Sequence, residues 1–371
     1  MYSVTWLYRK PSLCAPGQFL KLSVYVDDTL LSGPSQAEVS ENVGLILERF
    51  PGRVIEPEFR GGFAVYDLLG ANWFYSQARG VSKLVMSDYI TKLAARFNVT
   101  KTARNPNLDE YDLDPQVNEV SDNIREIAGG LQWVVTVARP DIARAVNALS
   151  TYSAQNCTQA RLDAGKRIIA FLLGTRETGI VYTPGQEKKC QEKYEVDGLN
   201  QRFTPPPYNL YTDASFASAK DGYYSVSGAA LTFWGTPIAW RSSKQTILAQ
   251  STCQAEYIGA AEGLAMTEKY GFLEFYSHSS TMDGGLPAHM TLWVDSTSAM
   301  TAMKSAEPTA KTRHYVLKFL AVRQFAASRP DALRFCTTEC QRADALTKYC
   351  GPEQRRLLMG PLSSANLGGL A

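Results

Sequence analysis

Residues 183–207, TPGQEKKCQEKYEVDGLNQRFTPPP, divide the chain into two parts with different patterns. The segment is polar and charged, and it ends in three prolines, which have no backbone N–H to offer a helix or a sheet. Such a composition is typical of a linker or long loop at a domain boundary. We therefore expect domains at 1–120, 121–182 and 208–350, joined by the linker at 183–207 and followed by a tail at 351–371.

The part after the linker predicts a mixed α/β sheet with helices packed on it. Strands are expected over 208–218, 223–234, 237–242, 290–296 and 332–338. Helices are expected over 251–278, 297–305, 311–328 and 341–349. Three strands followed by a helix and then by alternating strands and helices fit one sheet covered by helices.

The part before the linker predicts a strand and helix platform followed by a helical region. Two short β-prone runs, 19–26 and 29–33, meet at Asp27 and Asp28, which fits a β-hairpin with the acids at its tip. A helix over 35–50, a strand over 63–75, a strand around a turn over 79–87 and a helix over 87–98 follow. Amphipathic stripes predict three helices over 121–138, 139–154 and 159–175.

Composition limits the class of protein. The 371 residues are 45% hydrophobic and 20% charged, which is usual for a globular chain, and the formal charge of +2 gives no global argument for nucleic-acid binding. Seven cysteines without a C-x-x-C pair argue against a disulfide framework or a zinc site and indicate a reducing compartment, cytoplasm or nucleus. No apolar run approaches the roughly 20 residues that span a bilayer. We expect a soluble intracellular protein without a membrane partner.

Four acids border apolar sequence and are the candidates for a site: Asp213, Glu256, Asp295 and Asp344. Asp213 and Asp295 sit on predicted strands, and Glu256 lies early in a helix whose Ser251 and Gln254 have capping-box spacing. Carboxylates repel one another, so a cluster of them needs a compensating cation, and Mg²⁺ suits hard oxygen ligands. Spacing alone leaves open whether the four acids meet or are separate solvated residues.

The chain resembles copia-type retrotransposon polyproteins in a series of motifs. Six of them follow the order of the ribonuclease H domain: 211-YTDASFAS, 240-WRSSKQ, 251-STCQAEYIGAAEG, 293-WVDSTSA, 311-KTRHYV and 343-ADALTK. The first half resembles the reverse transcriptase through 24-VYVDDTLLSG, 139-RPDIARAVNALS and 168-IIAFLLGTRETGIVY. The resemblance extends to about Gly351. It implies a truncated reverse-transcriptase palm and thumb followed by a ribonuclease H-like mixed five-stranded sheet with flanking helices.

The resemblance also assigns roles to residues. It implies that Asp213, Glu256, Asp295 and Asp344 hold two Mg²⁺ ions, with Mn²⁺ as an alternative, and direct water at the RNA strand of an RNA–DNA hybrid. His314 matches a histidine of the family. It would move protons or help the product leave, or it would be a surface or capping residue, and both interpretations stay open.

Basic residues are candidates for phosphate contacts, with a solvated helix face as the equal alternative. In the second half they are Arg241, Lys244, Lys311, Arg313 and Lys318. In the helical region they are Arg125, Arg139, Arg144, Arg161, Lys166 and Arg167, for which packing support is the alternative.

The Asp27–Asp28 pair resembles a polymerase metal site that lacks its other half. The resemblance makes Asp27 the metal ligand and Asp28 its companion, but it also requires an aspartate on an earlier strand, and no Asp or Glu precedes Asp27. We expect this motif to be degenerate and the chain alone not to extend a primer, unless a partner chain supplies the missing front.

Two competing hypotheses remain for the whole chain. One is a catalytically silent, host-retained module that binds partners or nucleic acid and leaves hybrids uncut with or without Mg²⁺. The other is a transposase or integrase of related fold, which would need a different set of acids.

Overall fold

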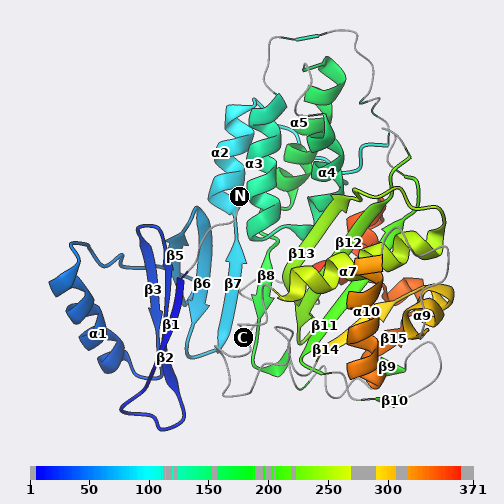
Figure 1. The fold of residues 1–371 in the computed structure, drawn as a ribbon. Coiled ribbons are helices and arrows are strands. Elements are labelled where there is room, and N and C mark those ends of the chain that lie inside the picture. Colours follow the sequence, from blue (N-terminus) through cyan, green and yellow to red (C-terminus); the bar gives the residue numbers. More distant parts are fainter. Residues whose placement is uncertain are drawn as a thin grey trace.

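The computed structural model describes residues 6–109, 111, 113, 119–120, 124–152, 157–186, 188, 195–196, 202–203, 206–218, 223–268, 290–305 and 316–360. In these residues helices and strands are mixed, and the strands form two five-stranded sheets, one three-stranded sheet and one two-stranded pair. Figure 1 shows the three larger sheets side by side, in chain order from left to right.

The chain begins with a three-stranded sheet and a helix. Its elements are β1 (Trp6–Pro11), β2 (Phe19–Tyr25), β3 (Asp28–Ser32) and α1 (Gln36–Arg49). The predicted hairpin is confirmed: Tyr25 pairs with Asp28, and the turn between them places Val26 at a φ of 51°. The predicted helix is confirmed too, and the Ser35 side chain caps it by accepting a hydrogen bond from the Glu38 N–H.

A five-stranded sheet follows, in the order β4-β5-β6-β7-β8. Its strands are β4 (Glu58–Arg60), β5 (Phe63–Leu68), β6 (Ala71–Ser76), β7 (Val81–Val85) and β8 (Ile180–Tyr182). The prediction of one strand over 63–75 is wrong, because the chain reverses there and β5 pairs with β6. Leu69 and Gly70 make the turn with φ angles of 55° and 76°, a conformation that glycine adopts readily.

Helices lie at the top of Figure 1, above the two five-stranded sheets. They are α2 (Ser87–Arg96), α3 (Ile124–Val137), the 3-10 turn η1 (Pro140–Ile142), α4 (Ala143–Thr151) and α5 (Gln159–Gly174). The three predicted helices of this region are confirmed. Pro140 stands at the first position of η1, where its missing N–H has no intrahelical partner to lose.

The second five-stranded sheet has the order β13-β12-β11-β14-β15. Its strands are β11 (Tyr208–Ser215), β12 (Val226–Phe233), β13 (Thr236–Lys244), β14 (Met290–Val294) and β15 (Leu333–Phe335). β11 pairs with β12 in antiparallel fashion and with β14 in parallel fashion, so the sheet is mixed. All five strands occur where the sequence predicts them.

Helices cover this sheet on both faces. They are α7 (Thr252–Glu268), α9 (Thr297–Lys304), α10 (Val316–Ser328), α11 (Asp344–Thr347) and α12 (Pro352–Met359), with the 3-10 turns η3 (Pro330–Ala332) and η4 (Thr338–Cys340). Figure 1 shows α7 and α10 in front of the sheet. The sequence places 351–371 in a tail, but α12 forms in it and buries Arg355, Leu358 and Met359.

Helix α7 lies very close to β11 because two glycines face the strand. A Cβ added to Gly263 would lie 2.6 Å from the Thr212 Cγ2, and one added to Gly259 would lie 3.3 Å from the Asp213 carbonyl oxygen. Glu256 is three residues before Gly259 and therefore on the same face of the helix. The glycines thus bring Glu256 to β11.

The helical region and the second sheet share one hydrophobic core. The cluster that contains Ile127, Leu131 and Val146 also contains Ala230, Leu346 and Leu358. The Trp240 indole donates a hydrogen bond to the Val135 carbonyl at 2.7 Å, which joins β13 to α3.

The expected linker and the remaining segments are described in part. Residues 195–196 (β9, Glu195–Val196) and 202–203 (β10, Arg202–Phe203) pair in antiparallel fashion. The division of the chain into domains stays a prediction. Within the described residues no helix has the length and apolar character needed to cross a bilayer.

Candidate metal centre

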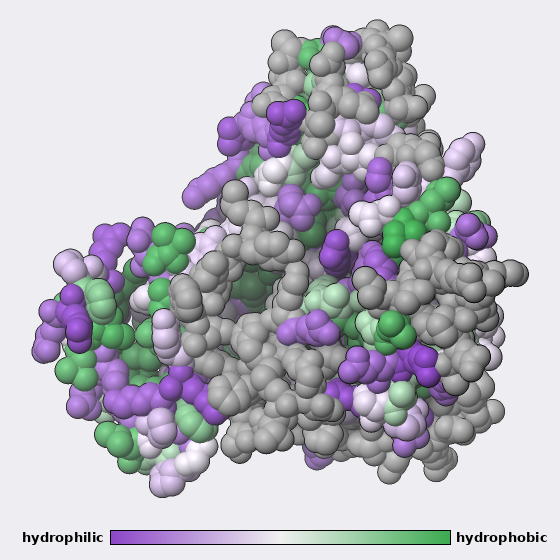
Figure 2. Space-filling model, in the orientation of Figure 1, coloured by the Kyte–Doolittle hydropathy of each residue, from purple (hydrophilic) through white to green (hydrophobic). Residues whose placement is uncertain are grey.

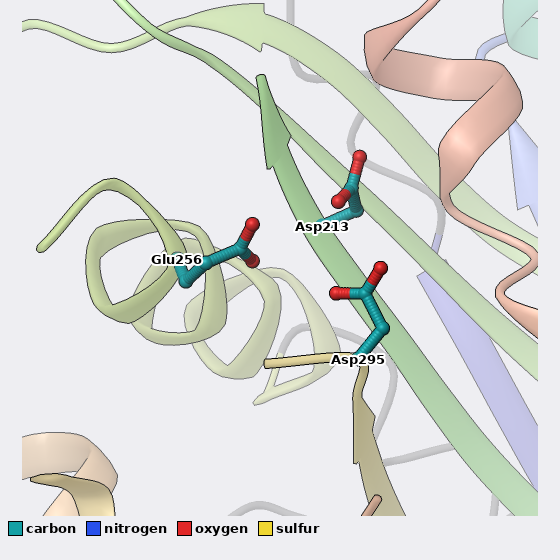
Figure 3. A group of neighbouring side chains, drawn as sticks. All are labelled: Asp213, Glu256 and Asp295. Atoms are coloured by element: carbon teal, nitrogen blue, oxygen red, sulfur yellow. The ribbon is translucent and has the colours of Figure 1, made fainter. Parts of the chain in front are cut away.

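Three carboxylates converge at the ends of two strands and the start of a helix. Each of Asp213, Glu256 and Asp295 offers an oxygen, and these oxygens lie within 4.8 Å of one another. Figure 3 shows Asp213 on β11, Asp295 just past β14 and Glu256 on α7 with their carboxylates turned toward a common space. The sequence predicted all three as site residues, and the fold brings them together.

The parallel pairing of β11 and β14 sets the level of the two aspartates. Tyr211 lies opposite Trp293 in this register, and two further residues along each strand lead to Asp213 and Asp295. Side chains alternate between the faces of a strand, so both aspartates fall on the face where the Tyr211 and Trp293 rings stack at 6.0 Å. Because the two aspartates lie at the same level of neighbouring strands and on the same face of the sheet, they meet although they are far apart in the chain.

The start of α7 is held by its own side chains. The Ser251 hydroxyl accepts a hydrogen bond from the Gln254 N–H at 3.2 Å, as the capping-box spacing predicts. The side-chain Oε1 of Gln254 accepts a hydrogen bond from the Gln250 N–H at 2.9 Å, whereas in a capping box the donor would be the N–H of Ser251. This cap fixes the first turn, and Glu256 follows it directly.

Glu256 is the acid whose environment is least favourable to charge. It is 5% exposed, and its Oε2 atom has no hydrogen-bond partner within the described part of the chain. Burial, followed by the charges of Asp213 and Asp295, raises the pKa of Glu256 to about 9. A buried carboxylate oxygen aimed at two aspartates and lacking a donor fits a cation ligand.

Asp344, the fourth predicted acid, joins the site through a lysine. It is buried at the start of α11, outside the group of three, and the Lys348 Nζ lies 2.9 Å from its Oδ1. The same Nζ lies 3.4 Å from each carboxylate oxygen of Asp213. Burial and the charge of Asp213 raise the pKa of Asp344 to about 6 although Lys348 favours its charged form.

Asp213 is the acid common to both groups. It is 1% exposed, and its Oδ2 accepts a hydrogen bond from the Thr347 hydroxyl as well as facing Lys348. Burial and Asp213 also raise the pKa of Asp295. The chemistry of this donor set, four carboxylates with one orphaned oxygen, fits a divalent cation of the hard type.

Sequence reasoning missed Lys348 and Thr347. Both stand in the stretch 343-ADALTK, but only its aspartate was assigned a role. The spacing of four residues between Asp344 and Lys348 was the available sign, because residues i and i+4 are neighbours on a helix.

The predicted polymerase acids lie elsewhere. Asp27 and Asp28 are exposed at the hairpin turn of the first sheet, and within the described residues they belong to no group of three metal-ligating side chains. Their assignment as a degenerate polymerase motif stays a prediction.

The predicted basic residues fall into different environments. Lys318 forms an ion pair with Glu262 of α7 at 2.5 Å, Arg241 is exposed, and the Lys244 Nζ lies over the Tyr224 ring at 5.2 Å. His314, Lys311 and Arg313 lie outside the described residues.

In the helical region, phosphate contacts by Arg139 and Arg161 do not fit the structure. The Arg139 side chain is fully buried and donates to both Asp141 oxygens at 2.8 Å, and Arg161 is buried with its Nε bonded to the Leu113 carbonyl. Arg167 bonds to Asn105. These arginines support packing, the alternative left open by the sequence.

A cavity of about 340 Å³ adjoins the acids. It lies between α4 and the second sheet, and its lining includes Arg144, Asn147, Ser215, Lys244, Thr347 and Lys348. Arg144 is positioned there by a hydrogen bond from its Nε to the Thr347 carbonyl at 3.0 Å. The helical region therefore forms one wall of this cavity, whose charged lining residues are Arg144, Lys244, Lys348 and one acid, Asp109, so the cavity is basic on balance.

The chain is similar to retrovirus-related Pol polyproteins of plant transposons. That of transposon TNT 1-94 from Nicotiana tabacum is 27% identical over 343 residues, which are 89% of this chain and 23% of the polyprotein. Those of RE1 and RE2 from Arabidopsis thaliana are 29% and 25% identical, over 64% and 88% of this chain. No family model matches.

These similarities relate the chain to retrotransposon Pol polyproteins. The chain spans 15% to 23% of the length of these three relatives.

Proposed function

We propose that this chain is a Mg²⁺-dependent ribonuclease that cuts the RNA strand of RNA–DNA hybrids. The observation that carries the proposal is the convergence of Asp213, Glu256 and Asp295 within 4.8 Å, from two strands and a helix. The second sheet supports the proposal as well. The six sequence motifs imply a ribonuclease H-like domain with a mixed five-stranded sheet and flanking helices, and the sheet β13-β12-β11-β14-β15 with α7 packed on β11 agrees with that expectation. The relation to Pol polyproteins supports it as well.

The carboxylates would hold Mg²⁺, which when bound supplies Lewis acidity toward a phosphodiester and an activated water. Asp213 lies between the other acids and would contribute to every ion held there. The buried Oε2 of Glu256 would gain in such an ion the partner that it lacks. Thr347 orients Asp213 by donating its hydroxyl proton to Oδ2.

The substrate would run along the basic cavity. Arg144 of α4 and Lys244 of β13 contribute positive charge to its lining, and Asn147 and Ser215 add polar groups. Two cations in one cavity beside a candidate phosphodiester-cleaving centre suit a nucleic-acid backbone. Discrimination for RNA would come from contacts to 2′-hydroxyl groups.

The test is hybrid cleavage with Asp295→Asn. The amide keeps the size of the side chain and removes its charge, so we expect cleavage of a labelled RNA–DNA hybrid to fall at least about 100-fold, the scale of a lost charge in a preorganised site. Asp331→Asn, an exposed aspartate of η3 in the same part of the chain, is the matched control and should keep full activity. Cleavage that survives Asp295→Asn contradicts the assignment. Hybrid binding without any cleavage by the unchanged chain would favour the silent module instead.

A further inference from the structure

Lys348 occupies a particular place among the carboxylates. Its Nζ bridges Asp344 at 2.9 Å and Asp213 at 3.4 Å, whereas Glu256 and Asp295 each offer an oxygen within 4.8 Å of one on Asp213. Asp213 is therefore shared between a half with three acids and a half in which an ammonium group stands between two acids.

The two halves differ in how their charge is balanced. Asp213 and Asp344 have buried side chains, so their mutual repulsion is poorly screened by water. Lys348 offsets this repulsion, because its ammonium group lies 2.9 Å from the Asp344 Oδ1 and 3.4 Å from the Asp213 carboxylate. In the other half the Oε2 of Glu256 has no donor among the described residues. Among the described residues, Lys348 makes direct ion pairs with Asp213 and Asp344 but not with Glu256 or Asp295, so the compensation is stronger in the half that contains Asp344.

An ammonium group and a divalent ion cannot share the bridging position. Mg²⁺ binds oxygens at about 2.0–2.1 Å and needs lone pairs that here face the Lys348 Nζ. The Lys348 side chain is 42% exposed and ends a flexible four-carbon stem, so it can move to solvent without unfolding α11. Its departure would leave Asp213 and Asp344 uncompensated unless another cation arrives.

We propose that Lys348 is the resident counter-cation of the Asp213–Asp344 half and competes with a divalent ion for it. The Asp213–Glu256–Asp295 half then takes the first ion, and the second binds more weakly because it must displace the lysine. This inference rests on the proposed function in that it takes the carboxylates to be a divalent-cation site.

The test is calorimetric titration of the whole chain with Mg²⁺, comparing the unchanged protein with Lys348→Gln and Lys348→Met. We expect the unchanged chain to bind one ion tightly and a second weakly. Removal of the ammonium group should tighten the second site at least about tenfold and leave the first within about threefold, since each tenfold step is about 1.4 kcal/mol of competition. Lys304→Gln, an exposed lysine at the end of α9, is the control and should titrate like the unchanged chain.

Thermal unfolding adds a readout that does not depend on activity. In EDTA the Lys348 variants should melt below the unchanged chain, because the buried acids Asp213 and Asp344 lose their cationic partner. Saturating Mg²⁺ should raise the melting temperature of the variants more than that of the unchanged chain. A variant that folds only with Mg²⁺ would be the extreme of the same result.

Two outcomes separate this inference from the proposed function. If the unchanged chain binds Mg²⁺ and Lys348→Gln leaves both affinities and the EDTA melting temperature unaltered, the competing role of Lys348 is wrong while the metal site stands. If the unchanged chain binds no Mg²⁺ in calorimetry, and Mg²⁺ shifts the melting temperatures of the unchanged chain and of Asp213→Asn equally, both the proposed function and the role of Lys348 are wrong.

Discussion

At the scale of single residues, the site is defined by carboxylates held where water cannot stabilise their charges. Glu256 shows this most clearly, because it is buried, faces two aspartates and keeps one oxygen without a donor in the described structure. The residue types could be predicted from sequence, because acids that follow apolar strands are placed by the core. The raised pKa of Glu256 could not be predicted from sequence, because it depends on burial and on aspartates that are far away in the chain.

The raised pKa of Glu256 predicts a pH-dependent stability in the absence of metal. With a pKa raised from 4.5 to about 9, the folded chain holds a proton that the unfolded chain releases, so stability is greatest below about pH 4.5 and declines up to about pH 9. The slope from this group is about 1.4 kcal/mol per pH unit. Glu256→Gln cannot release a proton, so in EDTA the variant should gain stability relative to the unchanged chain between pH 5 and pH 9.

Urea unfolding at four or five pH values measures this difference. Lys304→Gln serves as the control, and its curve should run parallel to that of the unchanged chain. Identical pH dependence for Glu256→Gln and the unchanged chain would contradict a raised pKa at Glu256.

At the scale of elements, the position of Glu256 depends on how closely α7 approaches β11. Gly259 and Gly263 face the strand, and the sequence shows them only as small residues in a helix, where glycine lowers helix propensity. The structure shows why both positions are glycine: α7 packs so closely on β11 that a Cβ at Gly263 would overlap Thr212. A side chain there would push away the helix that carries a metal ligand.

Gly263→Ala should therefore weaken both stability and metal binding. The new Cβ would lie 2.6 Å from the Thr212 Cγ2 and 3.4 Å from the Ala229 Cβ, so the helix must shift. We expect a loss of about 1–3 kcal/mol of unfolding free energy, the usual range for overpacking, and weaker Mg²⁺ binding in calorimetry.

Gly129→Ala in α3 is the matched control. Among the described residues no atom beyond the local helix backbone lies within 4 Å of the added Cβ, so this variant should be neutral or more stable by up to about 1 kcal/mol through helix propensity. Equal behaviour of the two alanine variants would show that α7 has room to spare.

At the scale of the whole molecule, the helical region and the second sheet behave as one packed body. Leu346 of α11 is fully buried in the cluster that contains residues of α3, α4 and α5, and Arg144 of α4 donates to the carbonyl of Thr347. The proline-rich linker predicts separate domains, and the sequence has no local sign of the contacts that cross between them. Shared burial links the stability of the helices to that of the sheet.

Leu346→Ala should destabilise both parts together by about 2–5 kcal/mol, the range for a large buried side chain reduced to a methyl group. Hydrogen exchange followed by mass spectrometry should show protection falling equally in α4, α5, β11 and β12. Leu248→Ala removes an exposed leucine and should change stability by less than about 0.5 kcal/mol. Loss of protection in β11 and β12 alone would show that the two parts unfold separately.

Local sequence was enough to predict the helices of the helical region and the five strands of the second sheet, because periodicities and caps such as Ser251 are local properties. It did not predict the reversal between β5 and β6 or the helix α12, which depend on pairing and burial against distant residues. Local sequence also determined which acids were candidates. Tertiary structure decided that three of them share one space, that Asp344 joins them through Lys348, and that α4 borders the cavity beside them. These contacts join residues far apart in the chain, so they depend on strand register, helix approach and shared burial, which no local pattern encodes.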